Sequence, residues 1–202
     1  MSGRFITFEG IDGSGKTTAC SFAAAWLRKQ GRSVEQTREP GGSPTAEELR
    51  SLLLKSQIEP RAELLLFVAA RVENIVHTVA PALAAGCDVI CDRYWDSTLA
   101  YQVGARGLDA GLVENLRSAL DLPEPELTIL MDLDPQHPRL SQPDLLDDDH
   151  LDNAGLAFQR RIREAFLDLS RRHAERYVVI DANAPLKQVS GCLEAALSER
   201  LS

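Results

Sequence analysis

The chain has 202 residues, of which 44% are hydrophobic and 26% are charged, and its net charge is −8. This composition is typical of a globular protein and excludes disordered, collagen-like and disulfide-scaffold classes. The acidic balance argues against a nucleic-acid-binding surface, which needs an excess of Lys and Arg. No apolar run approaches the roughly 20 residues of a membrane span, and the N-terminus lacks the features of a secretory signal. We therefore expect a cytoplasmic protein, with no membrane or nucleic-acid partner, whose four cysteines are free thiols.

Apolar runs alternate with helical patterns along the whole chain. Short apolar runs predict strands, and apolar residues spaced three or four apart predict helices. In chain order we expect a strand at 5–8, a helix at 17–30, a weak strand at 33–37, helices at 45–54 and 62–85, a strand at 88–91, a helix at 108–120, a strand at 127–131, a helix at 155–176, a strand at 177–180 and a helix at 186–201. Thr45 has the position of the first residue of a capping box, and Pro81 is expected to kink or split its helix.

This alternation predicts an α/β fold, with a parallel sheet covered by helices on both faces. We expect one domain over residues 1–202. Ligands of such folds bind at the carboxyl ends of the strands, and the motifs of this chain fall there.

Residues 10–17 read Gly-Ile-Asp-Gly-Ser-Gly-Lys-Thr and match the phosphate-binding pattern GxxxxGK[ST]. Glycines let successive backbone N–H groups point at one anion, and the helix N-terminus adds positive charge. Lys16 is expected to bind the β- and γ-phosphates, and the Thr17 hydroxyl to bind Mg²⁺. A glycine turn that merely starts a helix is the alternative, which the preceding strand and following helix disfavour. The pattern indicates a nucleotide phosphate, not a particular reaction.

Three other clusters follow predicted strands or helices. Arg38, in Thr37–Gly42, is able to make bidentate contact with a phosphate, or is a surface residue of a Pro-Gly turn. Asp92 has the place of a Mg²⁺-water partner and Arg93 that of an anion clamp, unless the two form a strand-end ion pair. Residues 97–102 combine hydroxyls, a ring and an amide suited to a sugar and a base edge, or open a helix capped by Ser97.

Phe67 and Arg71 lie four residues apart, and so on one face of a helix. Such a pair could stack on a base and donate to its carbonyl. A core phenylalanine and an exposed arginine are the alternative.

Four ordered strings resemble the bacterial thymidylate kinases. They are residues 8–18 (FEGIDGSGKTT), 37–42 (TREPGG), 65–71 (LLFVAAR) and 92–102 (DRYWDSTLAYQ). The resemblance covers about 4–134 and resumes from Phe158 to the C-terminus. It implies a nucleoside monophosphate kinase-like P-loop fold with a five-stranded parallel sheet. It also implies phosphoryl transfer from ATP to dTMP, giving dTDP and ADP in dTTP synthesis, with Mg²⁺ and a homodimeric state.

The resemblance also implies a role for each matching residue. Gly10, Asp12, Gly13, Ser14, Gly15, Lys16, Thr17 and Thr18 would bind ATP, with Thr17 and Asp92 at Mg²⁺. Arg38 and Arg93 would hold the dTMP phosphate, Phe67 would stack on thymine and Arg71 would bond the base, Tyr101 would lie against the deoxyribose, and Ser97 and Gln102 would line the base pocket. Lys16, Arg93, Asp12 and Arg38 would form the catalytic group.

The segment expected to form a mobile lid, at about 135–155, departs from the family. The family places a basic residue in the phosphate loop or an arginine-rich stretch in the lid, but residues 132–152 hold seven aspartates and one base, Arg139. Three readings stay open: a divergent lid whose charge comes from Arg139, Arg160 or Arg161; a kinase for another or modified deoxypyrimidine monophosphate; or a nucleotide-binding protein that transfers phosphate poorly. Losing a transition-state arginine costs on the order of 10³ to 10⁵ in rate, so the question concerns turnover.

Overall fold

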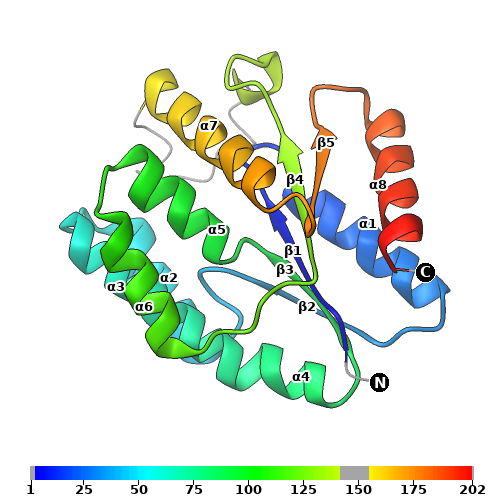
Figure 1. The fold of residues 1–202 in the computed structure, drawn as a ribbon, viewed down its shortest axis with the longest axis horizontal. Helices are drawn as coiled ribbons and strands as arrows, with labels where there is room; N and C mark the ends of the chain where they lie inside the picture. Colours follow the sequence, from blue (N-terminus) through cyan, green and yellow to red (C-terminus); the bar gives the residue numbers. More distant parts are fainter. Residues whose placement is uncertain (1–2, 142–154, 202) are drawn as a thin grey trace.

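A computed structural model describes residues 3–141 and 155–201. Within them, five strands form one sheet in the order β2-β3-β1-β4-β5, and every neighbouring pair is parallel (Figure 1). The strands are β1 (Phe5–Glu9), β2 (Val34–Arg38), β3 (Asp88–Asp92), β4 (Leu127–Asp132) and β5 (Tyr177–Asp181). The predicted α/β fold with a five-stranded parallel sheet is confirmed.

Helices cover both faces of this sheet. They are α1 (Lys16–Lys29), α2 (Pro44–Lys55), α3 (Pro60–Asn74), the π-helical turn η1 (Ile75–Val79), α4 (Ala80–Ala84), α5 (Trp95–Thr98), the π-helical segment η2 (Leu99–Ala105), α6 (Ala110–Leu120), the 3₁₀ turn η3 (Pro138–Ser141), α7 (Leu156–Arg172) and α8 (Leu186–Leu201). In Figure 1, α1 and α8 lie on one side of the sheet, and α3, α5, α6 and α7 lie on the other. Burial of apolar area on both faces is what stabilises such a layered fold.

Two apolar clusters make up the core of the described residues. The larger includes Ile6, Ile129 and Phe166 and joins the central strands to α1, α7 and α8. The smaller includes Leu64 and Trp95 and joins β3 to α3 and α5. All four cysteines are free thiols, as the sequence predicted.

Three predicted elements need correction. The N-cap of α2 is Ser43, whose side chain accepts from the Ala46 N–H, so Thr45 lies inside the first turn. The helix predicted over 62–85 begins at Pro60 and is not split at Pro81, because the π-helical turn η1 carries the chain continuously into α4. The last long helix, α7, ends at Arg172 rather than at residue 176.

The continuous helix Pro60–Ala84 has 25 residues, and its most apolar window has a mean hydropathy of 1.3. By length and composition alone it is long enough and apolar enough to cross a membrane. Charged residues such as Arg71 and Glu73 interrupt its apolar sequence, so no uninterrupted apolar run approaches 20 residues. The same helix packs Leu64 and Val68 into the core and carries the buried polar side chains of Glu63 and Arg71. This packing is that of a core helix within the fold.

Candidate active site

The phosphate-binding loop connects β1 to α1. Gly15, with φ 89°, is the N-cap of α1, and Gly10 has φ 143°. A Cβ on Gly10 would lie 2.6 Å from the Met131 carbonyl oxygen, so this close approach requires glycine. Lys16 donates to the carbonyl oxygens of Gly10 and Ile11, across 3.2 and 2.9 Å. Burial, and then the charge of Arg93, lowers the pKa of Lys16.

Thr17 and Asp92 meet at the side of this loop. The Thr17 hydroxyl donates to Asp92 Oδ2 across 2.7 Å. Thr17 is the second residue of α1, and Asp92 is the last residue of β3. The fold therefore brings the two predicted metal ligands together.

Arg93 lies at the centre of the site. Its guanidinium donates to Asp12, to Ser97 Oγ (3.1 Å) and to the Tyr101 hydroxyl (3.1 Å). Its Nη1 also donates to the carbonyl oxygen of Gly10 across 3.0 Å. Tyr101 completes the cluster by donating to Asp12 across 2.7 Å. Arg93 has φ 71°, a left-handed conformation that a non-glycine residue adopts only when its surroundings hold it there.

Arg71 is buried, which excludes the exposed-arginine alternative. Its Nε donates to Glu39 Oε2 across 2.6 Å, and its two other nitrogens donate to Thr98 Oγ1 and the Tyr94 carbonyl, both across 3.0 Å. Its guanidinium also lies 4.9 Å from the centroid of the Trp95 ring. Burial raises the pKa of Glu39, and Arg71 opposes that rise. Glu39 lies within the string TREPGG, but that string alone indicates no role for it.

Two more cations, Arg38 and Arg50, line the same cavity as Arg71 and Arg93. Arg38 donates to Glu47 across 3.1 Å, and Arg50 donates to the Pro40 carbonyl across 3.0 Å. Arg50 and Glu47 were not among the site residues predicted from the sequence. Glu47 and Arg50 lie four and seven residues after Ser43, the N-cap of α2, and so on one face of that helix, toward the loop after β2. An isolated Glu and Arg in a helical sequence give no sign of this contact.

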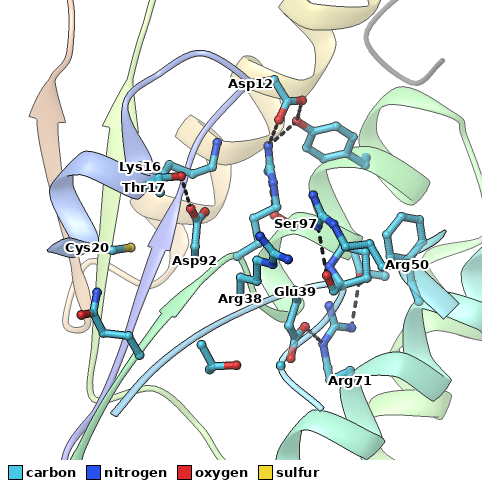
Figure 2. Close-up of a pocket in the computed structure, with 18 of the residues that line it drawn as sticks. Asp12, Lys16, Thr17, Cys20, Arg38, Glu39, Arg50, Arg71, Asp92 and Ser97 are labelled. Atoms are coloured by element: carbon cyan, nitrogen blue, oxygen red, sulfur yellow. Dashed lines mark hydrogen bonds and ion pairs between the residues drawn. The ribbon is translucent and has the colours of Figure 1, made fainter. Parts of the chain in front are cut away.

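These side chains surround one cavity of about 830 Å³. In Figure 2, Lys16 and Thr17 lie at one end of the view and Arg50 and Arg71 at the other. Every residue predicted to bind ATP, metal or dTMP lines the cavity except Gly10 and Ser14: Asp12, Gly13, Gly15, Lys16, Thr17, Thr18, Arg38, Phe67, Arg71, Asp92, Arg93, Ser97, Tyr101 and Gln102. Ser14 is buried inside the loop, and Gly10 packs against β4.

Three arginines were candidates for the missing positive charge, and their positions differ. Arg139 lines the cavity and donates to the Ser14 carbonyl (3.4 Å) and the Ala182 carbonyl (3.2 Å). Arg160 donates instead to Gln136 Oε1 across 2.7 Å, and Arg161 lies 5.8 Å from the centroid of the Phe158 ring. Most of the predicted lid, residues 142–154 with its acidic run, lies outside the described residues.

Comparison with known proteins supports the motifs. A family profile described as thymidylate kinase matches residues 8–191. This chain belongs to the thymidylate kinase family. It is 43% identical to a thymidylate kinase of Bifidobacterium longum subsp. infantis, over 100% of this chain and 88% of that one. It is 41% identical to one of Deinococcus radiodurans, over 98% of each. The crystal structure of a thymidylate kinase from Ehrlichia chaffeensis aligns with a TM-score of 0.81 and 34% identity, over 98% of this chain and 99% of that one.

Family membership over nearly the full length of these relatives confirms the predicted class of enzyme, a thymidylate kinase that uses ATP. It favours this class over the two alternatives, another acceptor or a poorly active nucleotide-binding protein. The role of each side chain is a separate matter, which depends on the geometry of this chain.

Proposed function

We propose that this cavity transfers the γ-phosphoryl group of ATP to dTMP, with the phosphate loop at the donor end and the arginine cluster at the acceptor end. The observation that carries the proposal is that one cavity holds Lys16 together with Arg38, Arg50 and Arg93. A site for one phosphate group would need fewer cations than these four. Two nucleotides that meet through their phosphates need positive charge on both sides.

At the donor end, the loop N–H groups and the start of α1 bind the β- and γ-phosphates. Lys16 is held over the loop by the Gly10 and Ile11 carbonyl oxygens. Its ammonium group has a third N–H for a phosphate oxygen. Because burial, and then the neighbouring Arg93, already disfavour its charge, an arriving anion stabilises it strongly.

The Thr17–Asp92 pair fits Mg²⁺. Both ligands are oxygen, the atom that hard cations prefer, and Mg²⁺ typically takes one or two protein ligands together with substrate phosphates. Consistent with that, no group of three or more His, Cys, Asp or Glu able to hold a metal occurs among residues 3–141 and 155–201. Mg²⁺ bound there would neutralise charge on the phosphates.

At the acceptor end, Arg93 and Arg38 would bind the dTMP phosphate, with Arg50 beside them. The contact of Asp12 with both Arg93 and Tyr101 holds these two side chains toward the sugar. Phe67 would stack on the base, and Arg71 and Gln102 would meet its polar edge. Since Glu39 and Thr98 fix the Arg71 guanidinium, it presents a fixed donor rather than a mobile side chain.

The transfer breaks the bond from the γ-phosphorus to its bridging oxygen and forms one to a dTMP phosphate oxygen, releasing ADP. The acceptor oxygen is already anionic, so no strong general base is needed. Catalysis therefore rests on alignment of the two nucleotides and on neutralisation of the moving phosphoryl group.

Arg139 is the residue that supplies the charge missing from the phosphate loop. It lies against that loop through the Ser14 carbonyl, and its buried Nε has no hydrogen-bond acceptor among the described residues. A buried N–H without an acceptor is costly, and a phosphate oxygen would satisfy it. Arg160 and Arg161, in contrast, are engaged outside the cavity.

A cytoplasmic homodimer remains part of this proposal. Leu52, Leu65 and Val76 are large apolar side chains, each about half exposed, on the adjoining elements α2, α3 and η1. Exposed apolar side chains in one region mark candidate contact surfaces. Light scattering after size-exclusion chromatography measures the mass directly, and a monomer at micromolar concentration would contradict the dimer.

ADP release from MgATP tests the function, with dTMP, dUMP, dCMP, 5-hydroxymethyl-dUMP or no acceptor. We expect turnover that depends on dTMP and exceeds that with the other acceptors. Faster turnover with another acceptor would move the substrate, and ADP release without an acceptor would indicate hydrolysis instead of transfer.

A further inference from the structure

A buried carboxylate lies behind the base end of the cavity. Glu63, on α3, is 2% exposed. One of its oxygens accepts from Gln102 Nε2 across 3.0 Å, and the other accepts from Arg106 Nη2 across 2.8 Å. Gln102 and Arg106 come from η2 and the residue after it, so Glu63 ties α3 to the segment that carries Tyr101 and Gln102.

This contact fixes which way the Gln102 amide points. An ionised carboxylate only accepts hydrogen bonds, so the NH₂ group must face Glu63. Arg106 Nη2 lies 2.8 Å from the other Glu63 oxygen, and such a cationic partner offsets the cost of burying a carboxylate charge. The amide oxygen of Gln102 therefore points away from Glu63, and no donor reaches it among the described residues. Because Gln102 lines the cavity, the protein offers a hydrogen-bond acceptor there.

Arg71 offers the opposite group. Three of its five N–H groups go to Glu39, Thr98 and the Tyr94 carbonyl. Arg71 also lines the cavity. A guanidinium has no acceptor, so whatever faces its other N–H groups must accept. The base end of the cavity thus presents a fixed donor and a fixed acceptor.

This pair matches the edge of one kind of pyrimidine. Thymine and uracil carry an N3–H donor beside the O4 acceptor. Cytosine carries an N3 acceptor beside the N4 amino donor, so both of its groups would oppose those of the protein. A site whose buried polar groups lose their partners rejects the wrong ligand strongly.

We propose that Glu63 is a positioning residue that sets base specificity: by fixing the Gln102 amide, it selects thymine or uracil nucleotides and rejects cytosine nucleotides. The inference rests on the proposed assignment of this end of the cavity to the base of dTMP. Without Glu63, rotation of the amide by 180° would present a donor to cytosine N3 at no steric cost.

The direct test is Glu63→Gln, because a glutamine at 63 either donates or accepts and no longer dictates the orientation of Gln102. Binding of dTMP, dUMP and dCMP is measured by calorimetry without ATP, and kcat and KM are measured with each acceptor. We expect the preference for dTMP over dCMP to fall at least about tenfold, in both Kd and KM, with dUMP following dTMP. Glu73→Gln, on the same helix and paired only with His77 among the contacts of the described residues, is the matched control and should retain the preference.

A second measurement uses the unaltered chain and so does not depend on the folding of a variant. The side-chain NH₂ resonances of Gln102, assigned by NMR, should keep their shifts and slow exchange when dTMP is added, because the NH₂ group still faces Glu63. Reorientation of that group on dTMP binding would overturn the proposal.

The outcomes separate this inference from the proposed function. A folded Glu63→Gln variant with an unchanged dTMP-to-dCMP ratio overturns the positioning role, while kinase activity stands. A wild-type chain that binds dTMP no better than dCMP also overturns it. A wild-type chain that discriminates in binding but forms no dTDP overturns the proposed function and leaves the role of Glu63 supported.

Discussion

The hydroxyl of Thr17 lies 2.7 Å from Oδ2 of Asp92 and donates to it, joining the first turn of α1 to the last residue of β3. The two residues are 75 positions apart in the chain. They meet because β1 and β3 are neighbours in the parallel sheet, so the loop after β1 opens beside the end of β3. An oxygen pair at this place suits a cation shared with the phosphates of a nucleotide.

Replacing Asp92 tests that pair. Asp92→Asn removes the negative charge but keeps an oxygen, so we expect the Mg²⁺ concentration for half-maximal activity to rise by about tenfold or more. Titration of activity with Mg²⁺ at saturating ATP measures it. Asp168→Asn, at an exposed aspartate of α7, is the control and should leave the titration unchanged. Equal Mg²⁺ requirements in the Asp92 variant and the wild type would exclude Asp92 as a ligand.

Arg139 should matter for rate more than for affinity. If its guanidinium neutralises the moving phosphoryl group, Arg139→Gln lowers kcat on the order of 10²-fold and changes KM for ATP and dTMP much less. Arg160→Gln, at an arginine bonded to Gln136 outside the cavity, should keep kcat within about twofold. Steady-state kinetics of both variants decide the matter. A loss of kcat in the Arg160 variant alone would show that Arg160, rather than Arg139, supplies the charge.

The buried Glu39–Arg71 pair should contribute to stability as well as to binding. Glu39→Gln leaves the Arg71 charge buried without its counter-ion, so we expect a loss of about 3 kcal/mol in the free energy of unfolding. Glu47→Gln, which breaks the exposed pair with Arg38, should cost under about 1 kcal/mol. Urea unfolding followed by circular dichroism measures both. Similar costs for the two variants would contradict the difference in burial.

The raised pKa of Glu9 should make the free energy of unfolding depend on pH. Burial, and then the nearby charge of Asp96, raises the pKa of Glu9 from 4.5 to about 7. Between these values the folded chain binds a proton that the unfolded chain has released. The free energy of unfolding should therefore fall as pH rises through this window, by up to about 1.4 kcal/mol per pH unit from this group.

Glu9→Gln removes the titrating group while keeping an acceptor for the Tyr94 N–H. Urea unfolding at pH 5, 6, 7 and 8 should show a shallower decline in this variant than in the wild type. Identical pH profiles for the two chains would show that the Glu9 proton does not control stability in this range.

The sequence predicted the parts of the site that depend on local patterns. The phosphate loop is contiguous, so Lys16 and Thr17 could be found from one string, and the five strands followed from the alternation of apolar runs. The helical segments Trp95–Thr98 and Leu99–Ala105 were expected only under the alternative that Ser97 caps a helix. Trp95, Asp96 and Ser97 are all buried, so the start of this segment gives no clean amphipathic pattern.

What the sequence could not predict were contacts between distant elements. The pairs Glu39–Arg71 and Glu63–Gln102 each join two elements more than 30 residues apart, and no spacing rule marks such a pair. The choice of Arg139 over Arg160 likewise depended on which side chain the turn after β4 brings to the phosphate loop. The π-helical turn η1 was missed because Pro81 alone suggested a break.

The most direct test of the account is the fate of the γ-phosphoryl group. Radiolabel in the γ-position of ATP should pass to dTDP in the wild-type chain when dTMP is present. It should do so neither in Lys16→Ala nor in Arg93→Ala, although both variants should keep the wild-type circular dichroism spectrum. Label recovered as inorganic phosphate from the wild type, or as dTDP at the wild-type rate from either variant, would contradict the claim that this cavity joins a phosphate donor to dTMP.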